Sequence, residues 1–193
     1  MTDATKDPAA PPLAAYALWL VPTVPEQREK FQNLINDLAS LELPSPIFSP
    51  HITLIHPIPL STRLSDIHSS LKEAIKATSS KHSLEKFTVD LGPAQKGEKY
   101  YQSVLSPVST ANEALLTLRE EVENVFSLKN LPEYFPHLSL FYGGVSPKRR
   151  DEIAKIANEK IGDMGKLEVG EIAIVSCVGT AEKWEVVGRE KLE

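Results

Sequence analysis

Two short segments of the chain repeat a pattern of residues that can do acid–base chemistry. Residues 50–54 are PHITL and residues 136–140 are PHLSL, so both run proline, histidine, apolar residue, hydroxyl residue, leucine. Residues i and i+2 of a β-strand point to the same side. Each segment, if it forms a strand, therefore presents an imidazole (His51, His137) and a hydroxyl group (Thr53, Ser139) on one face.

Together the two segments offer the groups that a phosphate-directed acid–base site needs. An imidazole has an ordinary pKa of about 6.5, so at neutral pH one ring can accept a proton while a second ring donates one. If the segments pack about a pseudo-twofold axis, His51 and His137 flank one reacting centre. The hydroxyl groups of Thr53 and Ser139 are neutral donors for phosphoryl oxygens, so a phosphate can be held without a basic patch.

Two other interpretations of the histidine pair stay open. The rings could be partly buried structural groups bonded to neighbouring hydroxyls, or they could be metal ligands. Neither segment contains a cysteine or carboxylate, which leaves a metal short of ligands, so we expect no metal and no cofactor. His68 is also followed by serine and leucine (HSSL), but its segment has helical spacing, where i and i+2 diverge. His56, which precedes Pro57, is interpreted as a loop histidine of no special role, with a place near the mouth of the cleft as the alternative.

Segments with strand periodicity and segments with helix periodicity alternate along the chain, and both motifs are preceded and followed by the same kinds of element. Each half is expected to run strand, helix, motif strand, helix, strand, with one extra strand at the end. This repeat predicts an α+β fold of two similar lobes, with antiparallel sheets and outer helices related by pseudo-twofold symmetry around a central cleft; an ordinary α+β domain without duplication is the alternative. The expected strands besides the second motif are 14–21, 52–55, 84–91, 100–108, 167–177 and 184–189, and the expected helices are 26–41, 65–77, 110–128 and 147–161.

The composition is that of an ordinary globular chain. Its 193 residues are 41% apolar and 24% charged, and the net charge of −5 disfavours a protein that grips a long nucleic acid. We expect residues 1–12 to be a disordered lead-in and residues 13–193 to form one bilobal domain, with lobes at roughly 13–92 and 99–193. No apolar run approaches a membrane span, and the single cysteine, Cys177, suits a reducing compartment. We therefore expect an intracellular, cytoplasmic monomer, and leave open peripheral association with an organelle such as the Golgi.

The paired segments resemble the His-x-Thr/Ser motifs of the 2H phosphoesterases, and most of all the small cyclic phosphodiesterases of plants and fungi. The likeness extends over AYALWLVP, GEKYYQSV, EIAIVSCV and KWEVV, and so over nearly the whole chain after residue 13. It implies a metal-independent enzyme that hydrolyses nucleoside 2′,3′-cyclic phosphate to the 2′-phosphate. It also implies hydrolysis of ADP-ribose 1″,2″-cyclic phosphate, a by-product of tRNA splicing, to the 1″-phosphate. Residues 58–63 and 95–99 match nothing in the family, which leaves the substrate open.

The same resemblance assigns roles to individual residues. It implies that His137 is the base and His51 the acid of a small cyclic-phosphate nucleotide hydrolase. Tyr142 would face away from His137 on a regular strand, so its assignment requires the chain to bend at residues 143–144. The substrate-binding residues that the resemblance implies are Thr53, Ser139, Tyr142, Trp19 and Tyr101.

Three points of function stay open at this stage. Core packing explains Trp19 and Tyr101 as well as substrate contact does. An RNA-end or 2′,5′-phosphodiesterase or ligase-type 2H enzyme is one alternative, and it would need a basic groove. A non-catalytic nucleotide-binding module is the other.

Overall fold

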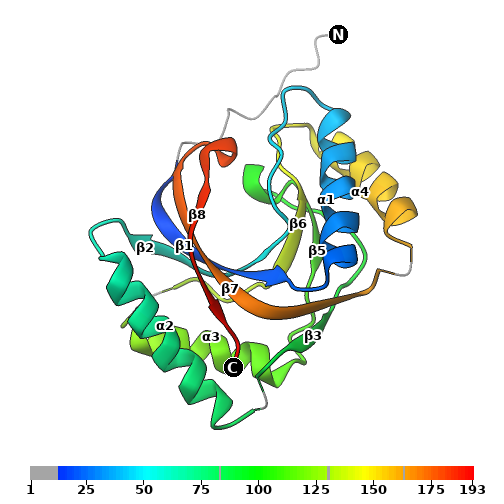
Figure 1. Cartoon of the computed structure of the whole chain (residues 1–193). Helices are drawn as coiled ribbons and strands as arrows, with labels where there is room; N and C mark the ends of the chain where they lie inside the picture. The colour runs from blue at the N-terminus through cyan, green and yellow to red at the C-terminus, as the bar shows by residue number, and fades with distance from the viewer. Residues whose placement is uncertain (1–12, 83, 130, 163) are drawn as a thin grey trace.

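The computed structural model describes residues 13–82, 84–129, 131–162 and 164–193. The predicted disordered lead-in, residues 1–12, lies outside the described residues. Within these ranges the chain forms eight β-strands, four α-helices and two 3-10 helices (Figure 1). The strands are β1 (Leu13–Pro22), β2 (Ile52–Pro59), β3 (Phe87–Asp90), β4 (Gln95–Lys96), β5 (Val104–Pro107), β6 (His137–Phe141), β7 (Lys166–Gly179) and β8 (Glu185–Lys191). The helices are α1 (Pro25–Ser40), α2 (Leu64–Ser79), α3 (Glu113–Val125) and α4 (Pro147–Ile161), with 3-10 helices η1 (Tyr100–Gln102) and η2 (Ala181–Lys183).

The strands of the described residues form one antiparallel sheet, and the predicted α+β class is confirmed. The strand order is β3-β7-β1-β2-β6-β5-β4, and β8 also pairs with β7. The sheets expected for the two lobes are joined into one, because the motif strands β2 and β6 pair at Ile52 and Leu138. This pairing places both histidine motifs side by side in the middle of the sheet.

Elements from the two halves of the chain are interleaved. β7, near the C-terminus, pairs with β1 and β3 from the first half. Helix α1 contacts β6, and α3 contacts both α2 and β2. In Figure 1, α1 and α4 lie together at one end of the molecule, and α2 and α3 lie together at the opposite end. The proposed lobe boundaries, 13–92 and 99–193, stay a prediction.

The two faces of the sheet have different surroundings, as β1 illustrates. Leu18 and Leu20 are fully buried in the main hydrophobic core with residues from all four helices. Ala17 and Trp19 alternate to the opposite face, where they pack in a smaller cluster with Cys177. This second face is the one toward which the motif histidines project, because Trp19 pairs directly with Thr53 of β2.

Local sequence signals define the helix starts. Pro25 opens α1, where its missing N–H group costs nothing. The Asn112 side chain caps α3 by accepting a hydrogen bond from the backbone N–H of Leu115, at 2.9 Å. The Ser146 hydroxyl caps α4 by accepting from the backbone N–H of Arg149, at 3.3 Å.

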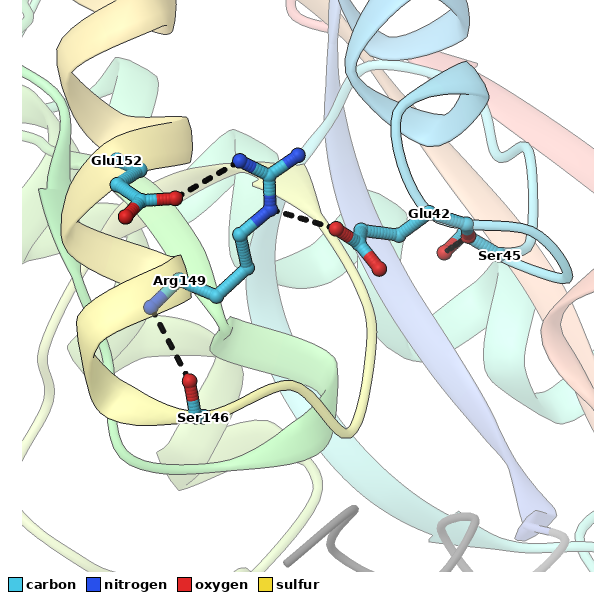
Figure 2. Close-up of polar contacts among 5 residues, drawn as sticks. All are labelled: Glu42, Ser45, Ser146, Arg149 and Glu152. Atoms are coloured by element: carbon cyan, nitrogen blue, oxygen red, sulfur yellow. Dashed lines mark hydrogen bonds and ion pairs between the residues drawn. The ribbon is translucent and has the colours of Figure 1, made fainter. Parts of the chain in front are cut away.

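The loop that leads into β2 is tied to α4 by charged side chains (Figure 2). Arg149 Nε donates to a Glu42 carboxylate oxygen at 2.5 Å, and Arg149 Nη1 donates to Glu152 at 2.9 Å. Farther along the loop, the Phe48 carbonyl accepts a hydrogen bond from Gln32 Nε2 of α1, at 3.1 Å. These contacts fix the segment immediately before the first motif to two helices.

Most predicted elements have somewhat different bounds in the structure; the strand predicted at 84–91, for example, spans Phe87–Asp90. Residues 100–102, predicted as the start of a strand, form η1, because the buried Ser103 hydroxyl donates to the Tyr100 carbonyl at 2.9 Å and competes with strand pairing. β2 continues past the predicted end to Pro59, since beyond Thr53 it pairs with β1 alone and the prolines need not donate to a second neighbour. Helix α3 is shorter than predicted and spans 113–125.

Candidate active site

The two histidine motifs are related by a local twofold axis of the sheet. Ile52 pairs with Leu138, and an antiparallel pair has a twofold axis midway between its partners. In this register His51 lies opposite Ser139 on the neighbouring strand, and His137 lies opposite Thr53. Both central residues are completely buried in the core, so the histidines and hydroxyl residues on either side face the opposite surface. The pseudo-twofold convergence expected from the sequence is thus present at the motifs themselves.

Both imidazole rings are oriented by the same backbone contact. His51 Nδ1 lies 2.6 Å from the Ser49 carbonyl oxygen, and His137 Nδ1 lies 2.8 Å from the Phe135 carbonyl oxygen. A carbonyl can only accept, so each Nδ1 carries the hydrogen. In the neutral ring Nε2 is then the basic nitrogen. The two motifs therefore present the same tautomer and leave the same nitrogen for proton transfer.

His51 is the more deeply buried of the two rings. Its side chain is 4% exposed, and the Trp19 ring stacks on it at 3.6 Å with an interplanar angle of 9°. The Phe48 ring meets it edge-on at 6.2 Å. Desolvation by this burial lowers the pKa of His51 to about 4, although its bond to the Ser49 carbonyl acts in the opposite direction. His51 is therefore neutral at pH 7 unless a bound anion raises this pKa.

His137 lies at the more open end of the pair. Its ring is half-buried and packs beside the Phe135 ring at 5.5 Å. Desolvation is the largest effect that lowers the pKa of His137; the Phe135 carbonyl raises it and nearby Lys99 lowers it. Phe135 itself is 50% exposed, so an aromatic surface borders this histidine on the solvent side.

The hydroxyl groups differ in their surroundings. Ser139 is buried, and its Oγ donates to the Tyr101 carbonyl at 3.2 Å, whereas Thr53 is half-buried. A hydroxyl rotates about its C–O bond and can redirect its hydrogen to a bound anion. Each histidine thus has a hydroxyl group from the other motif as its cross-strand neighbour.

Tyr142 reaches the same face through a β-bulge. Leu105 of β5 pairs with Ser139, and the preceding residue of β5 pairs with Phe141, so Leu140 is an extra residue in β6. Leu140 and Phe141 both lie in the core, and the side-to-side alternation is shifted by one. The inversion that the sequence placed at residues 143–144 therefore occurs before Tyr142, inside the strand.

The aromatic residues pack around Tyr142. Its ring stacks on Phe48 at 3.7 Å and meets Tyr101 edge-on at 5.3 Å. Burial raises the pKa of the Tyr142 hydroxyl, and a side-chain hydrogen bond with Ser139 offsets this only in part. Trp184 adds a further ring, 5.3 Å from Tyr101 and 6.0 Å from Trp19. Tyr142 is thus a neutral phenol at all ordinary pH values.

One cavity of about 890 Å³ is lined by every site residue that the sequence predicted. The volume is within the range typical of small-molecule sites. Its charged lining residues among the described parts of the chain are two acids and two bases: Glu98, Glu133, Lys99 and Arg119. The lining therefore has no net positive charge, and hydroxyl and imidazole groups are the main polar features at its centre.

Arg119 and Tyr134 also line this cavity, although no sequence motif predicted them. Arg119 is buried and donates to the Leu54 carbonyl and to Glu123, and its guanidinium lies 4.6 Å from the centre of the Tyr134 ring. The Tyr134 hydroxyl donates to the Thr53 carbonyl at 3.2 Å. Both contacts come from the second half of the chain and fix the backbone of the first motif. The only sequence signal for Arg119 is its position beside the apolar stripe of a helix. That position does not show which residue the arginine contacts.

In the described ranges, no group of three or more His, Cys, Asp or Glu side chains is placed to bind a metal ion. None of the helices in the described part of the chain is both long and apolar enough to cross a membrane.

Comparison with known proteins shows which family the chain belongs to. Residues 14–192 match the family described as "Cyclic phosphodiesterase-like protein", and the chain belongs to this family. A "2',3'-cyclic-nucleotide 3'-phosphodiesterase" of Kluyveromyces lactis is 26% identical, covering 89% of this chain and 95% of that protein. A crystal structure of a phosphoesterase superposes with a TM-score of 0.56 at 14% identity, covering 93% of this chain and 99% of the other. E. coli LigT in apo form gives 0.51 at 13% identity, covering 94% and 98%. The fold is that of the LigT-like 2H phosphoesterases.

Proposed function

We propose that this protein hydrolyses small cyclic phosphodiesters without a metal ion. The substrates we propose are nucleoside 2′,3′-cyclic phosphate, which gives the nucleoside 2′-phosphate, and ADP-ribose 1″,2″-cyclic phosphate, which gives ADP-ribose 1″-phosphate. The observation that supports this most strongly is the pair of histidine–hydroxyl sets that face each other across Ile52 and Leu138 beside one cavity. The name of the Kluyveromyces lactis relative supports cleavage at the 3′ oxygen.

The proposed reaction uses one proton acceptor and one proton donor. His137 Nε2 removes a proton from water as the water oxygen forms a bond to phosphorus. The bond between phosphorus and the 3′ oxygen breaks, and His51 gives a proton to that oxygen, which becomes the free 3′ hydroxyl. Thr53 and Ser139 donate hydrogen bonds to the remaining phosphoryl oxygens, where negative charge develops.

His51 needs the substrate's charge in order to serve as the acid. Its pKa of about 4 means that its ring is almost entirely neutral at pH 7. An anionic phosphate at hydrogen-bonding distance favours the protonated ring and raises this pKa. The cyclic phosphate therefore helps to charge the group that later protonates its own leaving oxygen.

The aromatic residues have supporting roles in this proposal. Trp19 is 5% exposed and stacks on His51, so we assign it to holding that ring rather than to contact with a base. Tyr142 supplies a phenolic hydrogen-bond donor near Ser139. Tyr101, which is half-buried at the cavity, borders the same region.

The direct test offers both substrates to the purified protein, with and without EDTA, and identifies the products by phosphorus NMR. We expect turnover of at least one substrate to the stated product, at an unchanged rate in EDTA. His51→Ala and His137→Ala should each lower kcat by about 10²- to 10⁴-fold. His82→Ala is the matched control, because His82 contacts Thr117 and does not line the cavity. Absence of turnover on both substrates, or full activity in both alanine variants, would refute the proposal, and a loss of activity in EDTA would refute its metal-free form.

The order of the two histidines is tested with an activated substrate. A p-nitrophenyl phosphodiester releases a leaving group that needs no proton, so loss of the general acid should matter little. We expect His51→Ala to keep a much larger share of wild-type activity on this ester than on the cyclic nucleotide, and His137→Ala to lose both activities. The reverse pattern would make His51 the base and His137 the acid.

A further inference from the structure

A third histidine lies on the same face as the proposed catalytic pair. Trp19 of β1 pairs with Thr53, and the preceding residue of β1 pairs with Ile55, so Leu54 is an extra residue in β2. Leu54 and Ile55 are both fully buried in the core. This bulge shifts the alternation of side chains between the two faces of the sheet by one residue. His56 therefore faces the cavity and is one of its lining residues. The loop position that the sequence suggested for His56 is wrong, because the residue lies inside β2.

His56 and Tyr142 occupy equivalent places about the local twofold axis. Each follows its motif histidine by five residues, and each reaches the cavity through a bulge at the third residue after that histidine. The resemblance assigned Tyr142 to the substrate, and its symmetry mate carries a hydrogen-bonding ring. The two positions extend the site in opposite directions from the phosphate-binding centre.

The ring of His56 has an unused polar atom. Its Nε2 is buried and has no hydrogen-bond partner among the described residues. A buried polar atom without a partner is uncommon in a native structure and costs free energy. The strand beneath it is firmly held, since Arg119 and Tyr134 bond to the carbonyls of Leu54 and Thr53. The geometry is that of a preformed contact that a ligand completes.

The chemistry of this ring suits a neutral partner. Burial lowers the pKa of His56, so the ring is neutral at pH 7 and offers one donor and one acceptor. A nucleobase edge carries both donors and acceptors, whereas the anionic group of a cyclic phosphodiester offers only acceptors. His56 is therefore matched to a base edge better than to an anion.

The position of His56 along β2 also favours a nucleobase as its partner. His56 is four residues from Ile52, which lies at the twofold axis, and because one of these residues is the bulged Leu54 the segment spans the length of three regular strand residues, about 10 Å. The base is the part of a nucleoside 2′,3′-cyclic phosphate that lies farthest from the phosphorus. We propose that His56 hydrogen-bonds the nucleobase of a nucleotide whose phosphate lies between His51 and His137. This inference rests on the proposed function and adds a specificity residue to it.

The test compares ligands with and without a base. Calorimetry measures the affinity of adenosine 2′-phosphate and of inorganic phosphate for the wild type, for His56→Ala and for His56→Gln, with His82→Ala as the control. We expect His56→Ala to lower the affinity for adenosine 2′-phosphate by about 3- to 10-fold more than the affinity for inorganic phosphate. A difference of this size corresponds to the loss of one hydrogen bond. His56→Gln, which keeps a donor and an acceptor, should recover part of the loss. In the wild type, the ¹⁵N signals of His56 should move on addition of adenosine 2′-phosphate and stay in place on addition of inorganic phosphate.

The outcomes separate this inference from the proposed function. Equal weakening of both ligands, or no weakening of either with unmoved ¹⁵N signals, overturns the base contact. If the wild type binds nucleotide but turns over no cyclic phosphate, the proposed function fails, and the ratio of affinities still decides the role of His56. If His56→Ala does not fold, the glutamine variant and the wild-type NMR titration decide the question.

Discussion

Acidification should destabilise this protein through His51 before the carboxylates become protonated. The residue is 4% exposed, and its ring has a pKa of about 4 in the folded protein, against an ordinary value of 6.5 in an unfolded chain. Between these two values the unfolded chain binds a proton that the folded protein rejects. Stability contributed by the neutral ring is therefore complete above pH 6.5 and is lost as the pH falls toward 4.

The size of the effect follows from the two pKa values. Linkage gives a loss of about 2 kcal/mol in the free energy of unfolding between pH 7 and pH 5 from this one group. The full difference, reached below pH 4, is about 3 kcal/mol, since each pKa unit corresponds to about 1.4 kcal/mol. Such a loss is a large part of the total stability of an ordinary domain.

The assay is urea unfolding at pH 7, 6 and 5 for the wild type and for His51→Gln, which cannot be protonated. Burial also lowers the pKa of His56 and His137, but these groups are present in both proteins and their effects cancel in the difference. We expect the stability of the variant to fall by about 2 kcal/mol less than that of the wild type over this interval. Equal slopes for the wild type and His51→Gln would show that His51 is not held neutral by burial.

Three further substitutions test the site. Trp19→Leu removes the ring stacked on His51 and should lower kcat by about 10-fold, with Trp19→Phe restoring most of it; wild-type kinetics in the leucine variant would contradict the positioning role. Ser139→Ala removes one donor to the developing charge and should lower kcat by roughly 10²-fold with little change in KM, so a change confined to KM would argue for ground-state binding alone. Arg119→Met leaves the Leu54 carbonyl and Glu123 without their buried partner and should cost about 2 to 4 kcal/mol in thermal unfolding; an unchanged melting temperature would show that the contact does not support the motif.

The duplicated motif could be interpreted from sequence because strand geometry is local. Alternation with a period of two places His51 with Thr53 and His137 with Ser139 in any regular strand. The same rule predicted the wrong face for Tyr142 and did not predict that His56 lines the cavity. Both strands contain a bulge, and a bulge depends on the register with a neighbouring strand that is distant in the chain.

The irregular segment at residues 100–102 escaped prediction for a related reason. The residues YYQSV have strand-forming character, but the Ser103 hydroxyl bonds to the Tyr100 carbonyl and to the Gly143 carbonyl. The second of these partners, Gly143, lies two residues beyond the end of β6. A contact over such a distance cannot be found from local periodicity, and it turns this segment into a short helix beside the site.

The amino-acid sequence by itself determined which groups can take part in chemistry: two imidazoles and two hydroxyls, each pair on one side of a strand. Residue type and a period of two are properties of a few neighbouring amino acids, so they could be predicted without a fold. Only the tertiary structure decided how these groups meet and what protonation state they hold. The pairing of Ile52 with Leu138 brings the motifs together, and the burial of His51 under Trp19 lowers its pKa. Register and desolvation both depend on segments far apart in the chain, which is why folding was needed to settle them.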